Sequence, residues 1–186
     1  DAGVEDDTLY TADVTRTFPV NGKFTEVQAK VYNAVLEAAD AAFAVAKPGR
    51  KFHELHDAAM EVLAHRLEEW GLLPVSAEVS LTIEGGQHRR WMPHGTSHHL
   101  GLDVHDCAQA KAELYMWAEL EPGMVFTIEP ALYFKEEDMS IPEEYRGIGI
   151  RLEDDVLCTE DGNVNLSAAL PRTVEGIEEW MAKLAK

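Results

Sequence analysis

Apolar side chains recur at every third or fourth position over two stretches of the chain, a period that predicts two amphipathic helices. The first is expected to begin near Thr25, a residue type that caps helix N-termini, and to end before Pro48. The second is expected to run from about His53 to Trp70 and to end at Gly71. The apolar positions are Val27, Val31, Val35, Ala38, Ala39, Ala42 and Phe43 in the first helix, and Leu55, Ala59, Val62, Leu63 and Trp70 in the second.

Runs of β-branched and aromatic residues, bounded by turn-forming residues, predict short strands elsewhere. One run covers residues 14–20 and predicts a strand or a strand pair that ends at the turn dipeptide Asn21-Gly22. Residues 72–101 are irregular and rich in Gly, Pro and His, a composition typical of loops that carry functional sites. No repeat or linker divides the chain, so one α+β domain is expected over residues 1–186. Further strands are expected at 124–129, 132–134, 147–151 and 156–159, and a closing helix at 173–184.

Charge and composition exclude several classes of partner. The 186 residues include 16 Lys and Arg against 34 Asp and Glu, a formal net charge of −18. Nucleic-acid and anionic-membrane surfaces need basic patches, so neither partner is expected, and no apolar run approaches the roughly 20 residues that span a bilayer. Cys107 and Cys158 are too few for a disulfide framework or a zinc-finger cluster, which favours a cytoplasmic, reducing location.

The densest chemical feature is residues 94–106, where four histidines and two aspartates fall within thirteen positions. A single histidine is more often a hydrogen-bonded or surface residue than a ligand, but four together favour a functional site. Alternating apolar residues after position 99 predict a loop followed by a strand. On a strand, His98 and His105 would face opposite ways, so the spacing alone leaves the set of ligands open.

Four acidic residues stand apart from the acidic clusters that are expected to be solvated turns. Asp1 and Asp13 flank an expected strand turn, where an aspartate most often makes a local hydrogen bond. Glu129 and Glu153 lie in apolar, β-rich surroundings, where an unpaired charge is costly. For these two glutamates, the sequence favours a buried ion pair with Arg151 and metal ligation about equally.

If these four carboxylates met His98, they would carry four negative charges, which cannot all persist at close quarters without cations. Two divalent ions would balance that charge. A ligand set with many oxygens, one nitrogen and no sulfur favours hard, six-coordinate ions such as Mn²⁺.

The order of four motifs resembles that of the Xaa-Pro aminopeptidase (aminopeptidase P) family, which belongs with prolidase to the pita-bread metallopeptidases. The motifs are Asp1-Ala-Gly with Asp13-Val-Thr-Arg-Thr-Phe, the block from His94 to Asp106, Glu121-Pro-Gly-Met with Thr-Ile-Glu129-Pro, and Gly149-Ile-Arg-Leu-Glu153-Asp-Asp. They cover nearly the whole chain, and the histidine block is specific to the proline-handling branch. The resemblance implies the pita-bread fold and an exopeptidase that hydrolyses the bond between an N-terminal residue and a following proline.

The resemblance also implies two divalent metal ions and a set of ligands. Asp1 would chelate one ion, Asp13 and Glu153 would bridge both, and His98 with Glu129 would complete the other. A water activated between two cations is a good nucleophile near neutral pH.

The resemblance gives further residues roles toward the substrate, which would be a peptide with proline at its second position. Glu129 would accept a proton from the attacking water and return it to the leaving proline nitrogen. His105 and His94 would contact the substrate carbonyl and stabilise its developing charge. Tyr133 and Arg151 match substrate-binding positions. Assembly into a homo-oligomer is also expected.

Two departures and two alternatives accompany the resemblance. Asp1 and Asp13 lie twelve positions apart, one more than the family pattern, which predicts a bulge at residues 6–10. The sequence starts at the first expected ligand without Met, so we expect the C-terminal part of a longer catalytic domain, truncated on its N-terminal side, that needs its missing upstream segment for activity. The alternatives are a prolidase restricted to dipeptides and a non-catalytic pita-bread binding module.

Overall fold

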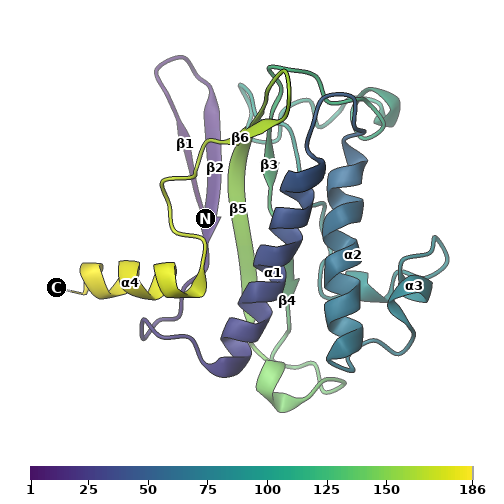
Figure 1. Ribbon diagram of the computed structural model, residues 1–186, viewed down its shortest axis with the longest axis vertical. Helices are drawn as coiled ribbons and strands as arrows, with labels where there is room; N and C mark the ends of the chain where they lie inside the picture. Colours follow the sequence, from purple (N-terminus) through teal and green to yellow (C-terminus); the bar gives the residue numbers. More distant parts are fainter. Residues whose placement is uncertain (186) are drawn as a thin grey trace.

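The computed structural model describes residues 1–185, and at its centre lies an antiparallel sheet of six strands organised around β5 (Gly149–Cys158) (Figure 1). β1 (Ala2–Glu5) pairs only with β2, at one end of the sheet. The strands that pair directly with β5 are β2 (Thr11–Arg16), β3 (Val125–Ile128), β4 (Ala131–Tyr133) and β6 (Asn163–Asn165). β5 therefore fixes the relative positions of residues from both halves of the chain.

Two long helices pack beside each other against the sheet (Figure 1). α1 (Glu26–Val45) starts with a capping box, in which Gln28 N donates to the Thr25 hydroxyl at 3.2 Å and Thr25 N donates to the Gln28 side chain at 2.9 Å. α2 (His53–Glu69) packs along α1. The N-cap expected at Thr25 and the extents expected for both helices are confirmed.

Alternation along β5 separates a core face from a polar face. Ile150, Leu152 and Val156 belong to the buried apolar cluster that includes α1. Because successive side chains of a strand point to opposite faces, Arg151 and Glu153 lie on the other face, away from α1. The sheet thus presents a row of charged side chains on the side that the two long helices leave open.

The remaining elements are short and lie around this layer pair. The closing helix expected at the end of the chain is confirmed as α4 (Val174–Leu184). Within residues 1–185, no helix is both long and apolar enough to cross a membrane. The other elements are α3 (Ala77–Ser80) and the 3₁₀ turns η1 (Gln87–Arg90), η2 (Ala112–Leu114) and η3 (Glu143–Tyr145).

The strand expected over residues 14–20 is displaced toward the N-terminus, since β2 covers Thr11–Arg16. Pro19 lacks the N–H that a ladder position requires, and the Thr17 hydroxyl, rather than a continued ladder, contacts the backbone of Arg151. β-branched residues indicated that a strand forms in this region, but its end depends on where pairing with β5 stops, which the sequence does not show.

The two strands expected at 147–151 and 156–159 are a single strand, β5. The acidic residues between them resembled a turn, yet Asp154 is buried and forms ion pairs with Arg16 at 2.5 Å and Arg172 at 2.8 Å. A buried carboxylate that has two guanidinium partners can lie inside a strand. The charge of the acidic residues alone did not indicate these partners.

Candidate metal centre

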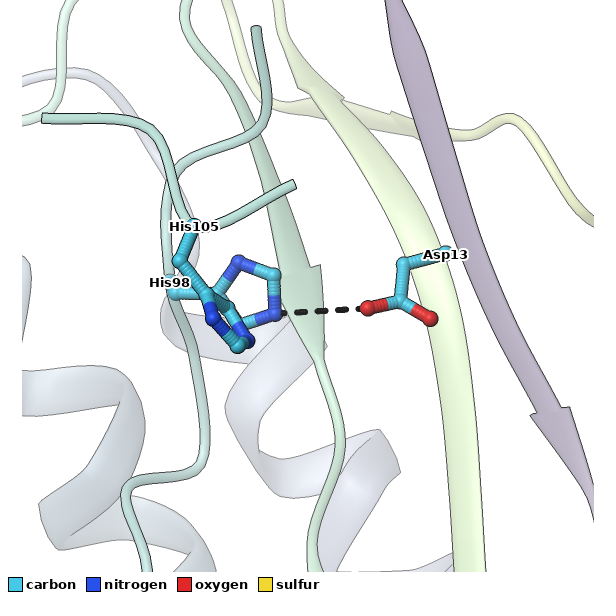
Figure 2. Close-up of side chains that lie close together, drawn as sticks. All are labelled: Asp13, His98 and His105. Atoms are coloured by element: carbon cyan, nitrogen blue, oxygen red, sulfur yellow. Dashed lines mark ion pairs between the residues drawn. The ribbon is translucent and has the colours of Figure 1, made fainter. Parts of the chain in front are cut away.

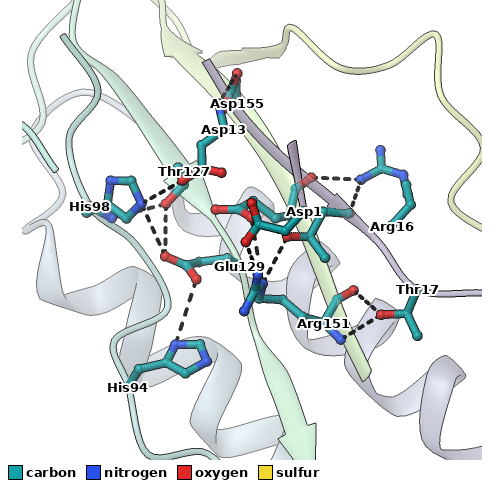
Figure 3. Close-up of polar contacts among 12 residues, drawn as sticks. Asp1, Asp13, Arg16, Thr17, His94, His98, Thr127, Glu129, Arg151 and Asp155 are labelled. Atoms are coloured by element: carbon teal, nitrogen blue, oxygen red, sulfur yellow. Dashed lines mark hydrogen bonds and ion pairs between the residues drawn. The ribbon is translucent and has the colours of Figure 1, made fainter. Parts of the chain in front are cut away.

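The four acidic residues and His98 come from separate segments and converge on the polar face of the sheet (Figure 3). Asp13 lies on β2 and Glu153 on β5, while Asp1 precedes β1 and Glu129 follows β3. Asp13 and Glu153 are buried, whereas Asp1 is exposed. The structure therefore brings together the five side chains that the sequence analysis considered as one set.

Main-chain hydrogen bonds to β3 place His98. Thr127 N donates to His98 O at 2.9 Å, and Glu129 N donates to Thr96 O at 2.7 Å. The loop thus runs along β3 as an additional, irregular strand. This arrangement brings His98 Nε2 to 3.4 Å from Glu129 Oε1 and to 3.7 Å from Asp13 Oδ2.

The strand expected after residue 99 is wrong. Leu102 is 59% exposed and Val104 is 36% exposed, so their alternation does not mark a buried face. The chain turns back instead, and it places the His105 ring edge-on to the His98 ring, with centroids 4.5 Å apart (Figure 2). Because this segment is a loop, the odd spacing of the two histidines does not separate them.

Potential ligand atoms form three overlapping groups, and within each group the atoms lie within 4.8 Å of one another. Asp13, His98 and Glu153 each belong to two of the groups, so the three groups form one connected cluster. The groups are Asp1, Asp13 and Glu153; His98, Glu129 and Glu153; and Asp13, His98 and His105.

The alternative to metal ligation was a buried ion pair between Arg151 and the two glutamates, and the structure shows only a loose contact of Arg151 with Glu153. Arg151 pairs with Asp1, and its Nε lies 3.7 Å from Glu153 Oε2, too far for a hydrogen bond. One guanidinium facing several converging carboxylates cannot neutralise them all, so the charge balance still favours added cations.

The turn-forming aspartate of the β1–β2 hairpin is Asp6, not Asp13. Asp6 Oδ1 accepts hydrogen bonds from Thr8 N at 2.7 Å and from the Thr8 hydroxyl at 2.6 Å. Leu9 has a φ of 71°, in the left-handed region, within the same hairpin loop. Asp13 lies within β2, where its side chain is directed to the centre rather than to a local turn.

The candidate substrate-binding residues form a hydrogen-bonded chain at the edge of the centre. Tyr133 OH lies 2.9 Å from His94 Nε2 and accepts a hydrogen bond from Arg151 Nη1 at 3.1 Å. His94 Nδ1 lies 3.8 Å from Glu129 Oε2. His94 and Arg151 therefore lie beside the converging carboxylates (Figure 3), with Tyr133 hydrogen-bonded to both, and the His105 ring packs against His98 (Figure 2).

Three polar residues of the site escaped the sequence analysis: Thr15, Thr127 and Asp155. The Thr127 hydroxyl donates to Glu129 Oε1 at 3.4 Å, and Asp155 accepts from Asp13 N at 3.3 Å. Each of the three lies two positions from a candidate ligand. On a strand, residues two apart share a face, so this period could have identified them.

Burial and mutual repulsion shift the protonation of the centre. Burial, with nearby Glu153, raises the pKa of Glu129 to about 8, and burial raises the pKa of Asp155 to about 6 and also that of Glu153. Burial lowers the pKa of His98. Without metal, the centre thus favours protonated carboxyl groups and a neutral imidazole, and a cation that replaces these protons would find ligands of the right chemical type.

This balance predicts that the metal-free protein loses stability as pH rises from about 7 to about 9. Between these pH values Glu129 is already ionised in the unfolded chain. In the folded protein Glu129 has a pKa of about 8, so it loses its proton within this range. The folded state binds more protons, so the free energy of unfolding falls as the pH rises. The expected fall is about 1 kcal/mol, which lowers the Tm by roughly 2–4 °C. Thermal unfolding in a chelator measures the change.

The matched variant is Glu129→Gln, which has no titrating group at this position and should show a flatter dependence over the same window. Excess Mn²⁺ should reverse the slope in the unsubstituted protein, because ionised carboxylates bind metal more tightly. An equal slope in both metal-free proteins would contradict the assignment of the proton to Glu129.

Comparison with known proteins places this chain in a family. The sequence model of metallopeptidase family M24 matches residues 1–160. The chain is 57% identical over 184 residues to Xaa-Pro aminopeptidase 1 of Streptomyces coelicolor, covering 99% of this chain and 37% of the relative, and 42% identical to Xaa-Pro aminopeptidase of Escherichia coli, covering 95% and 39%. The chain thus spans little more than a third of the length of these relatives.

Solved structures agree with the sequence relatives. The structure of the Pseudomonas aeruginosa aminopeptidase PepP superposes with a TM-score of 0.88 at 39% identity, covering 94% of this chain and 39% of that one. Zinc-substituted E. coli aminopeptidase P in complex with product gives a TM-score of 0.86 at 41% identity with the same coverage. The pita-bread fold expected from the motifs is confirmed, and the chain belongs to metallopeptidase family M24.

Proposed function

We propose that this chain carries the catalytic centre of an Xaa-Pro aminopeptidase, a metal-dependent exopeptidase that releases an N-terminal residue preceding proline. The observation that carries the proposal is the convergence of four carboxylates and His98 into overlapping groups that share Glu153. The names of the relatives, which are Xaa-Pro aminopeptidases, support the substrate class.

Two divalent ions would be held by Asp1, Asp13, His98, Glu129 and Glu153, whose potential ligand atoms converge. The ligand set is rich in oxygen and contains no sulfur, which favours Mn²⁺. When bound, such ions supply an activated water and polarise the substrate carbonyl.

The protein's own groups would move the proton and hold the substrate. Glu129 lies beside both His98 and His94, so it can accept a proton at the centre and pass it toward a leaving nitrogen. His94 lies beside Glu129 and His105 lies beside His98, and both are proposed to contact the carbonyl oxygen. Tyr133 and Arg151 would bind the residues beyond the scissile bond.

Hollows around Tyr133 favour an aminopeptidase over a dipeptide-specific prolidase. A hollow of 410 Å³ is lined by Tyr133, Asp1 and Arg151, and a second, of 350 Å³, is lined by Tyr133, Trp91 and Lys135 among others. Tyr133 lines both hollows, so we propose that the proline contacts Tyr133 and that the residues after it continue toward the second hollow.

A cytoplasmic location and a homo-oligomeric state remain parts of this proposal. Cys107 and Cys158 are both free thiols, which accords with a reducing compartment.

The deciding experiment compares Ala-Pro-Ala with Ala-Pro as substrates of the whole natural polypeptide, after its metal content has been measured. Release of alanine from the tripeptide supports the proposal. Cleavage of the dipeptide alone would instead indicate a prolidase. Binding of metal and peptide without cleavage of either would indicate a non-catalytic module.

A further inference from the structure

We propose that Thr15 is a positioning residue whose hydroxyl keeps Glu153 apart from Arg151 and thereby available to metal ions. The inference rests on the proposed function, because it takes Glu153 as a metal ligand. Thr15 on β2 is the register partner of Glu153 on β5, and only 6% of Thr15 is exposed.

The Thr15 hydroxyl lies between the two charged groups. It donates a hydrogen bond to Glu153 Oε2 at 2.5 Å and accepts one from Arg151 Nε at 2.9 Å. Arg151 Nε and Glu153 Oε2 are themselves 3.7 Å apart. A hydroxyl has one proton to donate, so this pairing fixes its orientation and links the cation to the anion without direct contact.

This separation matters because a guanidinium and a carboxylate in direct contact form short, charge-assisted hydrogen bonds. Such a pair at Arg151 and Glu153 would occupy carboxylate lone pairs that metal ions require. Arg151 also contacts Tyr133 and Asp1 through its other nitrogens, which keep the guanidinium near the centre. Removal of the Thr15 hydroxyl should therefore let Arg151 close on Glu153 and compete with metal.

Thr17 provides a matched control on the same segment (Figure 3). Its hydroxyl donates to Arg151 O at 2.9 Å and accepts from Arg151 N at 3.1 Å. The Thr17 hydroxyl, like that of Thr15, donates one hydrogen bond and accepts another. Both of its bonds are to the backbone of Arg151. Thr17→Val removes as many bonds as Thr15→Val and leaves the Arg151 and Glu153 side chains untouched.

The test is calorimetric titration of Mn²⁺ into the metal-free, full-length protein, with circular dichroism as the check of folding. Thr15→Val should weaken Mn²⁺ binding by about 10- to 100-fold, the usual cost of losing a partner that orients a ligand. Thr15→Ser, which keeps the hydroxyl, and Thr17→Val should stay within about threefold of the unsubstituted protein. Thr15→Ala replaces the valine variant if the latter does not fold.

A double-mutant cycle tests the mechanism itself. In an Arg151→Met background there is no guanidinium to exclude, so adding Thr15→Val should cost much less Mn²⁺ affinity than it does alone. Equal costs in the two backgrounds, or an equal loss in Thr17→Val, would overturn the inference. Failure of the unsubstituted protein to bind Mn²⁺ would instead overturn the proposed metal centre.

Discussion

Glu153→Ala is expected to abolish peptidase activity and to reduce metal content sharply. Glu153 belongs to two of the three groups of converging ligand atoms, so its loss removes an oxygen from each. Two cations held by the remaining carboxylates would share too few ligands, and because metal binding stabilises the folded state, added Mn²⁺ should no longer raise the Tm. Elemental analysis and hydrolysis of Ala-Pro-Ala measure the two effects.

Asp154 supplies the control for this substitution. It is adjacent to Glu153 on β5 and equally buried, with 1% of each residue exposed, but its carboxylate pairs with Arg16 and Arg172 rather than with the candidate ligands. Asp154→Ala should therefore lower the Tm while metal stoichiometry is retained. Normal turnover by Glu153→Ala, or equal metal loss in both variants, would contradict the assignment of Glu153.

Local patterns were sufficient to predict the three longest helices, α1, α2 and α4, but not the short α3. Thr25 and the apolar period indicated α1 correctly, because capping and amphipathic packing depend on residues within a few turns. The candidate ligands were likewise found from motif order, which requires no knowledge of pairing. Their convergence became visible only in the structure, where β5 joins segments of both halves.

Pairing across the sheet explains what the sequence did not predict. Thr15 contacts Glu153 across 138 positions of sequence, and the register of β2 on β5 brings them together. Likewise, the acidic centre of β5 resembled a turn because its cationic partners Arg16 and Arg172 lie far away in sequence. Long-range register of β2 on β5 brings Thr15 and Arg16 to their partners, and residue type alone carries little information about register.

The position of His105 leaves two chemical roles in competition. One of its nitrogens lies within 4.8 Å of ligand atoms of Asp13 and His98, so the geometry by itself would also admit His105 as a metal ligand. His105 is exposed, however, and lies at the rim of the centre on a loop, whereas the Asp13 and Glu153 carboxylates are buried and lie on strands. A side chain so placed is suited to contact a substrate that arrives from solvent.

His105→Ala should consequently retain the metal and lower kcat about 100-fold, the usual cost of losing a hydrogen bond to the developing oxyanion. Metal content measured alongside the rate separates the two roles, because removal of a metal ligand would lower both the metal content and the rate. His65→Ala, at an exposed position of α2, controls for loss of an imidazole and should change neither quantity. Depletion of metal in His105→Ala would reassign this histidine as a ligand, and an unchanged rate would remove it from the site.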